Sequence, residues 1–233
     1  MLSDLITHFV TEPSFDDVLA TAAELQAVVP GAVIVGGTAA ALDAHHRESA
    51  DNDHVVADLA ERFETILENL EALGDFSRAR VQPGKIILGS LGGIETGVRQ
   101  LRRSRPLETI ETVVGGNSIV LPTLEEILRV KAWLALTRNE TRDYLDLAAL
   151  SDRIGVQEAA AVLGAIDDYY ADLNADVEPV ATQVLRQLAD PRPRDEEVTR
   201  RLEAYKALVP RWQDWANVKG VLGSVAEAML AGC

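Results

Sequence analysis

The chain has 233 residues, of which 47% are hydrophobic and 25% charged, a composition typical of globular proteins that bury a core in one large or two small domains. Its formal net charge of −15 argues against nonspecific nucleic-acid binding, because phosphates repel an acidic protein. The single cysteine, Cys233, excludes an internal disulfide framework and a multi-cysteine zinc site.

No stretch of the sequence approaches the roughly 18 uninterrupted apolar residues that a membrane-spanning helix needs, so we expect no membrane partner. The first ten residues, MLSDLITHFV, lack the basic start and the small-residue cleavage site of a secretion signal. We therefore expect a cytoplasmic protein.

The first predicted elements are a helix and a strand. Residues 15–28 have apolar side chains at helical spacing, and Ser14 before them is typical of a helix N-cap. Pro30 and Gly31 end this helix. The β-branched run at 33–35 then predicts a short buried strand.

Two glycines, Gly36 and Gly37, end that strand, and glycine allows a sharp turn close to a ligand. Thr38 is a suitable N-cap for the helix that the alanines at 39–41 favour. The free N–H groups and the positive dipole at the start of a helix suit an anion such as a triphosphate. We therefore predict a phosphate site at this turn.

Two carboxylates follow, because Asp51 and Asp53 flank Asn52 ahead of the apolar pair Val55 and Val56. Residues two apart on a strand project to the same face, so both carboxylates are expected to point the same way. Mg²⁺ prefers oxygen ligands and commonly bridges one or two carboxylates to substrate phosphates. The pair predicts a Mg²⁺ site facing the phosphate turn.

The Gly-Gly-Thr turn followed by Arg47-x-Ser49-x-Asp51-x-Asp53 resembles the signature of the nucleotidyltransferase superfamily, in its AbiEii-like branch of abortive-infection toxins. That superfamily has a Gly-Gly or Gly-Ser pair, a helix and then an Asp-x-Asp strand, and the spacing here lies towards the long end of its range. The resemblance implies an α/β (α+β) core in which helices flank a mixed sheet. The residues that it places around the nucleotide are Gly36, Gly37, Thr38, Arg47, Ser49 and Arg142.

The next segments predict a helix over 57–73 and two strands within 85–98. Glu95 lies in the second of these strands. Many superfamily members have a third carboxylate on the strand after the Asp-x-Asp strand, so the resemblance implies this role for Glu95 in a two-metal site. The alternative is an outward-facing strand glutamate, and Glu108 and Glu111 are weaker candidates.

A strand at 118–121 and a helix at 124–137 follow. Thr123 and Glu126 have the spacing of a capping box at the start of this helix. Lys131 lies beside its apolar stripe, and by pattern alone it is a surface lysine whose stem covers apolar side chains.

A second block, Lys131…Arg138…Arg142-Asp143-x-x-Asp146, resembles the same family. In that family a helical lysine contacts the nucleotide phosphates, and an Arg-Asp-x-x-Asp helix completes the pocket. The resemblance therefore assigns Lys131 and Asp146 to the site. Asp143 alternatively pairs with Arg142 or Arg138 and shapes the helix.

Positive charge is concentrated between residues 78 and 142, a segment that contains eleven Lys and Arg residues, six Glu and no Asp. Within this segment four arginines form a short cluster, namely Arg99, Arg102, Arg103 and Arg105. Such a cluster is usually a solvated face, but beside a nucleotide site it can also guide an RNA or nucleotide phosphate.

The chain beyond residue 150 is helical in pattern. The predicted helices are 156–173, 177–188, 195–208 and 216–230. Trp212 and Trp215 are three apart, so we expect them on one helix face as packing anchors. We predict a nucleotidyltransferase core over residues 1–150 and a helical domain over 151–233.

The histidines give little support for a zinc site. His45 and His46 are adjacent, and neighbouring residues on a helix point about 100° apart, so both cannot readily bind one ion. His54 departs from the family, which usually has an apolar residue after the second aspartate.

The resemblance implies Mg²⁺-dependent transfer of a nucleoside monophosphate from an NTP to an acceptor hydroxyl. Glu95 or Asp146 is then the third metal ligand or the base. In related toxins the acceptor is proposed to be tRNA, and the partner is a cognate antitoxin. Two alternatives remain open: a catalytically silent binding module, and transfer to a cationic small molecule such as an aminoglycoside, which the acidic composition permits.

Overall fold

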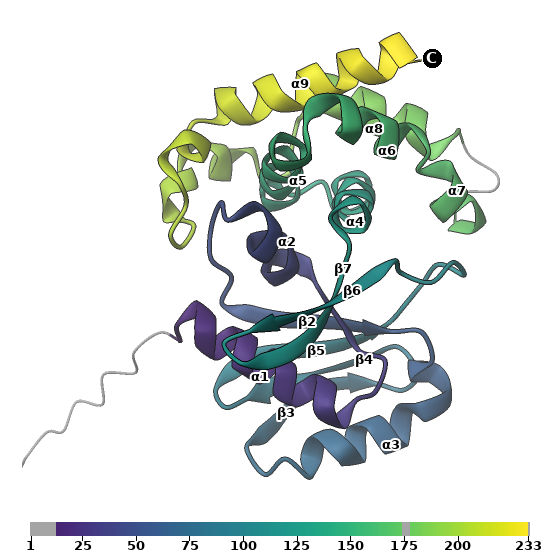
Figure 1. The fold of residues 1–233 in the computed structure, drawn as a ribbon, viewed down its shortest axis with the longest axis vertical. Coiled ribbons are helices and arrows are strands. Elements are labelled where there is room, and N and C mark those ends of the chain that lie inside the picture. The colour runs from purple at the N-terminus through teal and green to yellow at the C-terminus, as the bar shows by residue number, and fades with distance from the viewer. Residues whose placement is uncertain (1–12, 174–177, 233) are drawn as a thin grey trace, which may run out of the picture.

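The computed structural model describes residues 13–173 and 178–232 (Figure 1). Its helices are α1 (Phe15–Val28), α2 (Gly36–Ala44), α3 (Leu59–Glu71), α4 (Leu124–Thr137), α5 (Thr141–Ile154), α6 (Val156–Gly164), α7 (Asp167–Tyr170), α8 (Val180–Ala189) and α9 (Trp215–Gly232). Its strands are β1 (Val33–Val35), β2 (Asp51–Val56), β3 (Phe76–Gln82), β4 (Ile86–Leu91), β5 (Ile94–Gln100), β6 (Thr109–Val114) and β7 (Asn117–Pro122). None of these helices is long and apolar enough to cross a membrane. Cys233 and the first ten residues, on which two sequence predictions rest, lie outside the described residues.

Five strands form a mixed sheet in the order β1-β2-β5-β4-β3. β2 and β5 run parallel, whereas the other neighbouring strands are antiparallel. β6 and β7 form a separate two-stranded ribbon that leads into α4 (Figure 1). The predicted fold class, a mixed sheet flanked by helices and followed by further helices, is confirmed.

α1 and α3 cover one face of the sheet and form a buried apolar cluster with side chains such as Val56. Every second residue of β2 is buried, and the Asn52 side chain donates a hydrogen bond to the Val18 carbonyl of α1 (2.7 Å). Because side chains alternate along a strand, Asp51 and Asp53 lie on the opposite face. The alternation predicted for this strand is therefore confirmed.

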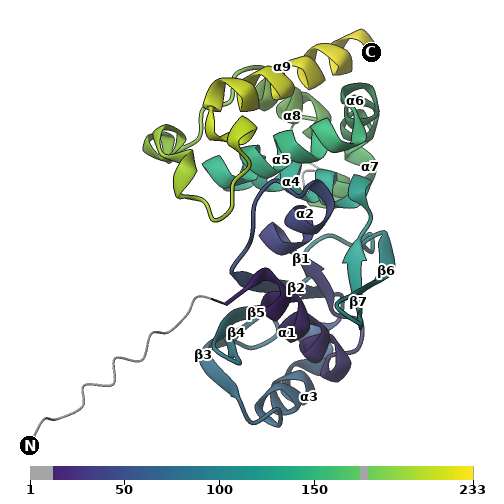
Figure 2. The same cartoon turned by 60° about the vertical axis from the view of Figure 1, so that its left-hand side comes forward.

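The helices α4 to α9 pack together at the other end of the molecule (Figure 2). Their buried residues share one apolar cluster with Ala39 and Ala40 of α2. α2 thus joins the two ends, because it packs on these helices and follows directly from β1. Residue 150, where we predicted a domain boundary, lies inside α5, and α4 and α5 share the cluster of the later helices.

Two strands, β3 and β6, were not predicted. Most of their side chains are exposed, so neither has the alternation of apolar and polar residues that marks a half-buried strand. The tryptophans were predicted to share one helix face, and this is wrong. Trp212 lies in a separate 3₁₀ turn, η4 (Pro210–Gln213), whereas Trp215 begins α9 and packs edge-on against Tyr144.

The helix predicted over 195–208 is also wrong. This segment forms two 3₁₀ turns, η2 (Glu196–Arg200) and η3 (Leu202–Ala204), and then runs beside the loop that follows α2. The Glu48 N–H donates to the Lys206 carbonyl, and the Val209 N–H donates to the His46 carbonyl, both at 2.9 Å. These bonds to a distant loop replace the i→i−4 bonds of a helix.

Candidate functional site

The first two residues of α2, Gly36 and Gly37, form one wall of a cavity of about 300 Å³. Gly36 has a φ of +73°, a left-handed conformation that favours glycine. A Cβ on Gly36 would lie 3.3 Å from the Cβ of Asp53, and one on Gly37 would lie 2.7 Å from the Arg47 guanidinium. The two glycines thus allow the backbone to approach the other site residues closely.

Thr38 is placed differently from its prediction as an N-cap and phosphate ligand. α2 begins at Gly36, and its N-cap is Val35. Thr38 is buried, and its hydroxyl donates to the Asp51 carbonyl (2.5 Å). Its side chain therefore ties α2 to the start of β2 and does not line the cavity.

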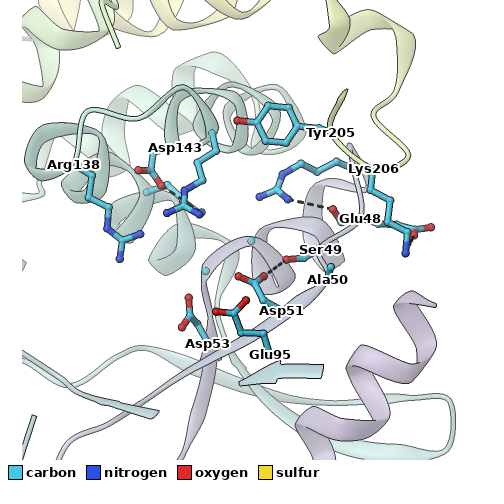
Figure 3. Close-up of a pocket in the computed structure, with 15 residues that line it drawn as sticks. Glu48, Ser49, Ala50, Asp51, Asp53, Glu95, Arg138, Asp143, Tyr205 and Lys206 are labelled. Atoms are coloured by element: carbon cyan, nitrogen blue, oxygen red, sulfur yellow. Dashed lines mark hydrogen bonds and ion pairs between the residues drawn. The ribbon is translucent and has the colours of Figure 1, made fainter. Parts of the chain in front are cut away.

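Three carboxylates line the same cavity (Figure 3): Asp51 and Asp53 on β2, and Glu95 on β5. Asp51 and Glu95 are register partners in neighbouring parallel strands, so both side chains project from one face of the sheet. The Ser49 hydroxyl donates to Asp51 Oδ1 (2.6 Å), and Arg99 Nε donates to Asp53 Oδ1 (3.3 Å). These contacts orient the two aspartates.

The oxygen donors of Asp51 and Asp53 fit a hard divalent cation. Across residues 13–173 and 178–232, no group of three or more His, Cys, Asp or Glu residues is arranged to hold a metal by itself. A Cβ on Gly97 would lie 2.9 Å from Asp53 Oδ1, so this glycine leaves room for the carboxylate.

Behind the cavity wall lies a buried charge network centred on Asp146 of α5. Its carboxylate forms an ion pair with Lys131 Nζ (2.6 Å) and accepts hydrogen bonds from Arg47 Nε and Nη2 (2.7 and 3.0 Å). His46 Nε2 lies 2.7 Å from the same carboxylate. Burial alone would raise the pKa of Asp146, but the charges of Arg47 and Lys131 outweigh it and hold that pKa well below its usual value.

Asp146 is therefore a positioning residue in this structure. It is fully buried and does not line the cavity, whereas Lys131 and Arg47, which it holds, both do. The surface position that the helical pattern alone gave Lys131 is wrong, because its side chain is 3% exposed.

The first turn of α5 presents a different carboxylate to the cavity, that of Asp143. Its side chain is 1% exposed, and its nearest cation is Lys131, 3.7 Å away. Burial raises the pKa of Asp143, because the positive charge of Lys131 offsets the loss of solvation only in part. The pairing with Arg142 or Arg138 is not formed, since Arg142 pairs with Glu140 (2.8 Å). Arg138 lines the cavity and forms no ion pair with another described residue.

Four lining residues were not predicted from the sequence, namely Glu48, Ala50, Tyr205 and Lys206. Tyr205 and Lys206 follow the 3₁₀ turns of the C-terminal segment and reach the cavity from the side opposite the sheet (Figure 3). Burial raises the pKa of Tyr205 to about 12, so its phenol stays protonated near neutral pH. No sequence motif indicates that these residues line a site, and the helix predicted over 195–208 gave no reason to expect Tyr205 and Lys206 there.

A second cavity of about 320 Å³ adjoins the first. The two share five lining residues, namely Asp51, Asp53, Glu95, Arg138 and Arg142. The second cavity extends over β5 and β4, where Arg99 and Leu88 line it. The carboxylates therefore lie where the two cavities meet.

The structure brings most of the predicted site residues to the first cavity. Those that line it are Gly36, Gly37, Arg47, Ser49, Asp51, Asp53, Glu95, Lys131 and Arg142. Thr38 and Asp146 lie behind its wall.

Sequence comparison finds relatives over part of the chain. No protein-family model matches it. It is 36% identical over 137 residues to the mycolic acid-containing lipids exporter MmpL11 of Mycolicibacterium smegmatis, and 40% identical over 143 residues to the heme uptake protein MmpL11 of Mycobacterium tuberculosis. These matches cover 58% and 60% of this chain but only 14% of either relative, so the chain corresponds to a small part of their length.

Structure comparison finds nucleotidyltransferases. The antibiotic-resistance factor ANT(2″)-Ia superposes with a TM-score of 0.53 at 14% identity, over 70% of this chain and 96% of that one. A protein from H. pylori described as a nucleotidyltransferase superposes at 0.50 and 15% identity over 94% of both chains. A nucleotidyltransferase-like protein from Paracoccidioides brasiliensis gives 0.50 at 18% identity, over 82% and 93%. The chain therefore has a nucleotidyltransferase fold.

Proposed function

We propose that the chain transfers a nucleoside monophosphate from an NTP to an acceptor hydroxyl in a Mg²⁺-dependent reaction. One observation carries this proposal. Asp51 and Asp53, on one face of β2, line a single cavity together with the Gly36–Gly37 turn at the start of α2. A metal-binding carboxylate pair beside a helix N-terminus is the combination that binding a metal–triphosphate complex requires.

The triphosphate is bound at the glycine turn. The first N–H groups of α2 have no partner within the helix, and its dipole favours an anion there. Lys131 and Arg47 add positive charge at the cavity wall, and Asp146 holds both in place. Because these groups are fixed before the substrate arrives, little reorganisation is needed on binding.

Asp51 and Asp53 hold the Mg²⁺, with Glu95 beside them on β5. When bound, the ion neutralises the triphosphate and stabilises the charge that develops at the α-phosphate and on the leaving pyrophosphate.

Glu95 is the base in this proposal. Asp146 is unsuited to that role, because it is fully buried and both of its oxygens accept hydrogen bonds from cations. The acceptor hydroxyl loses its proton to Glu95 and its oxygen bonds to the α-phosphorus. The bond to the bridging oxygen breaks, and pyrophosphate leaves.

The second cavity supports RNA as the acceptor, and the choice of tRNA rests on the AbiEii-like resemblance. Arg99, Arg138 and Arg142 line it next to the carboxylates. Guanidinium groups bind phosphate in planar, bidentate geometry, so they suit a nucleic-acid end.

A toxin role with a cognate antitoxin is part of the same proposal and rests on the AbiEii-like motifs alone. Growth arrest on expression of the wild-type chain, but not of Asp53→Asn, supports this role. Equal growth of the two strains at equal protein levels contradicts it.

The test incubates the purified chain with each α-labelled NTP, Mg²⁺ and total tRNA, and follows label on the RNA. We expect label with wild type and a loss on the order of a hundredfold in Asp53→Asn. Asp16→Asn, an exposed substitution on α1, is the matched control and keeps full activity. γ-Labelled NTP leaves the RNA unlabelled, because that phosphate departs in pyrophosphate.

The remaining outcomes separate the parts of the proposal. Label on a small molecule or a protein, but not on RNA, overturns only the acceptor. Nucleotide binding without transfer to any acceptor overturns the enzyme and favours a silent binding module.

A further inference from the structure

Several groups in the first cavity have no part in the proposed transfer chemistry, among them the Tyr205 ring and the Asp143 carboxylate. Figure 3 shows both on the helical side of the cavity, across from Asp51 and Glu95 on the sheet. An NTP whose triphosphate lies at the glycine turn still has to place its ribose and its base. The helical side is the wall that remains for them.

Tyr205 is the only aromatic side chain that lines either cavity in the described ranges. The Arg47 guanidinium lies over its ring, 5.8 Å from the centroid, and Arg47 is itself held by Asp146. The Tyr205 hydroxyl forms no hydrogen bond within residues 13–173 and 178–232. The position of the ring is thus fixed by the Arg47 guanidinium, and the Tyr205 hydroxyl can form a hydrogen bond with a ligand.

The segment around Tyr205 is held firmly at the cavity edge. The Lys206 carbonyl accepts the Glu48 N–H (2.9 Å), and Lys206 Nζ donates to the Pro13 carbonyl (2.7 Å). Leu202 and Leu208, on either side of Tyr205, are buried. Tyr205 is therefore presented by a preorganised wall.

Asp143 is a buried carboxylate whose oxygens are unsatisfied hydrogen-bond acceptors. Neither of its oxygens has a hydrogen-bond partner, and Lys131 Nζ is 3.7 Å away. A buried polar atom without a partner costs free energy, and such atoms are rare in folded proteins. Because Asp143 lines the cavity, a ligand can supply the missing donor.

We propose that Tyr205 and Asp143 form the nucleoside subsite of this cavity. The ring stacks on the nucleobase, and the carboxylate accepts a hydrogen bond from an N–H or O–H group of the nucleoside. Bases stack on aromatic side chains through a π-face that all of them share, so Tyr205 contributes affinity. A carboxylate accepts only from donors, so Asp143 contributes selectivity. This inference rests on the proposed function.

The first test compares an NTP with inorganic tripolyphosphate, which lacks the nucleoside. Affinities are measured calorimetrically with Mg²⁺ and a non-hydrolysable α,β-methylene NTP. Tyr205→Leu is expected to weaken NTP binding about tenfold or more and to leave tripolyphosphate binding unchanged. Tyr205→Phe retains the ring and keeps most of the affinity for the NTP.

Tyr169→Leu is the matched control. Tyr169 also lies against an arginine, with Arg129 3.8 Å from its ring centroid, but it lines neither cavity. We expect wild-type affinity for both ligands. Equal weakening of NTP and tripolyphosphate by Tyr205→Leu overturns the inference, since Tyr205 then acts through Arg47 and the phosphates.

The second test concerns Asp143→Asn, which keeps the shape and removes the charge. We expect the affinity ratios among the four NTPs, or between an NTP and its deoxy analogues, to change by about fivefold, the equivalent of one hydrogen bond. A change among the bases assigns the donor to the base, and a change with the deoxy analogues assigns it to the ribose. Unchanged ratios overturn the role of Asp143.

The wild-type affinities separate this inference from the proposed function. Binding of neither ligand overturns the proposed function itself. Equal affinity for NTP and tripolyphosphate leaves phosphate binding intact and overturns only the nucleoside subsite.

Discussion

The sharpest structural prediction concerns the carboxylate of Asp146. Asp146→Asn keeps the shape of the side chain but removes the charge that holds Lys131 and Arg47, whose side chains are only 3% and 8% exposed. Removing one partner of a buried ion pair typically costs about 3–5 kcal/mol, because the remaining charge stays buried and unpaired. For a chain of this size that corresponds to a fall in Tm on the order of 10 °C.

The assay is urea unfolding at pH 7, followed by tryptophan fluorescence and by far-UV circular dichroism, whose coincidence tests two-state behaviour. Asp51→Asn is the matched control, since Asp51 lines the cavity and is only partly buried. We expect a change below about 1 kcal/mol for it. In the double variant Asp146→Asn/Lys131→Met, the cost is smaller than the sum of the single costs by about 1–3 kcal/mol, because the two residues are in contact.

The pH dependence provides a second readout. A carboxylate whose pKa is lower in the folded state than in the unfolded state stabilises the fold above its unfolded pKa of about 3.9. That stability is lost as the pH falls towards the folded pKa. The difference in the free energy of unfolding between wild type and Asp146→Asn should therefore have its full size at pH 7 and become smaller below about pH 4. A free energy of unfolding within about 0.5 kcal/mol of wild type at pH 7, or an additive double variant, would refute the reasoning.

Three further substitutions test other parts of the structure. Gly36→Ala places a Cβ on a left-handed backbone, 3.3 Å from the Cβ of Asp53. This variant should lower the free energy of unfolding by about 1–3 kcal/mol and abolish NTP binding. Gly164→Ala, where a Cβ meets open space, should change neither property. His54 is fully buried, and burial lowers its pKa to about 3. The free energy of unfolding of wild type should therefore fall by about 3 kcal/mol between pH 6.5 and pH 4.5 in EDTA. His54→Leu should lose this pH dependence, and parallel pH profiles of the two proteins would contradict the prediction. Ser14→Ala removes the capping box of α1 and should cost about 1 kcal/mol in thermal unfolding, and no change in Tm would mean that α1 is held by packing alone.

The features that were predicted correctly depend on near neighbours in the chain. Ser14 caps α1 through Asp17, three residues away, and the side chains of Asp51 and Asp53 share a face because a strand repeats every two residues. The Gly36–Gly37 turn follows from the conformational freedom of glycine. Each of these can be inferred from a window of a few residues, whatever the rest of the chain does.

The features that were missed or placed differently depend on contacts between distant segments. Asp146 meets His46 across 100 residues of sequence, and no local pattern distinguishes a buried carboxylate from one that lines a cavity. Residues 195–208 are helical in pattern, yet the segment exchanges backbone hydrogen bonds with the loop after α2, and Tyr205 lines the cavity as a result.

The sequence by itself therefore determined the strand that carries Asp51 and Asp53 and the glycines before it, since strand period, glycine conformation and helix caps act within a few residues of one another, and its resemblance to the nucleotidyltransferase superfamily predicted the fold class. Only the tertiary structure decided which carboxylates line the cavity, which one lies behind its wall, and that Tyr205 stands across from the sheet. Those assignments depend on how α2, α4, α5 and the C-terminal segment pack together, because burial and charge pairing are properties of the assembled core.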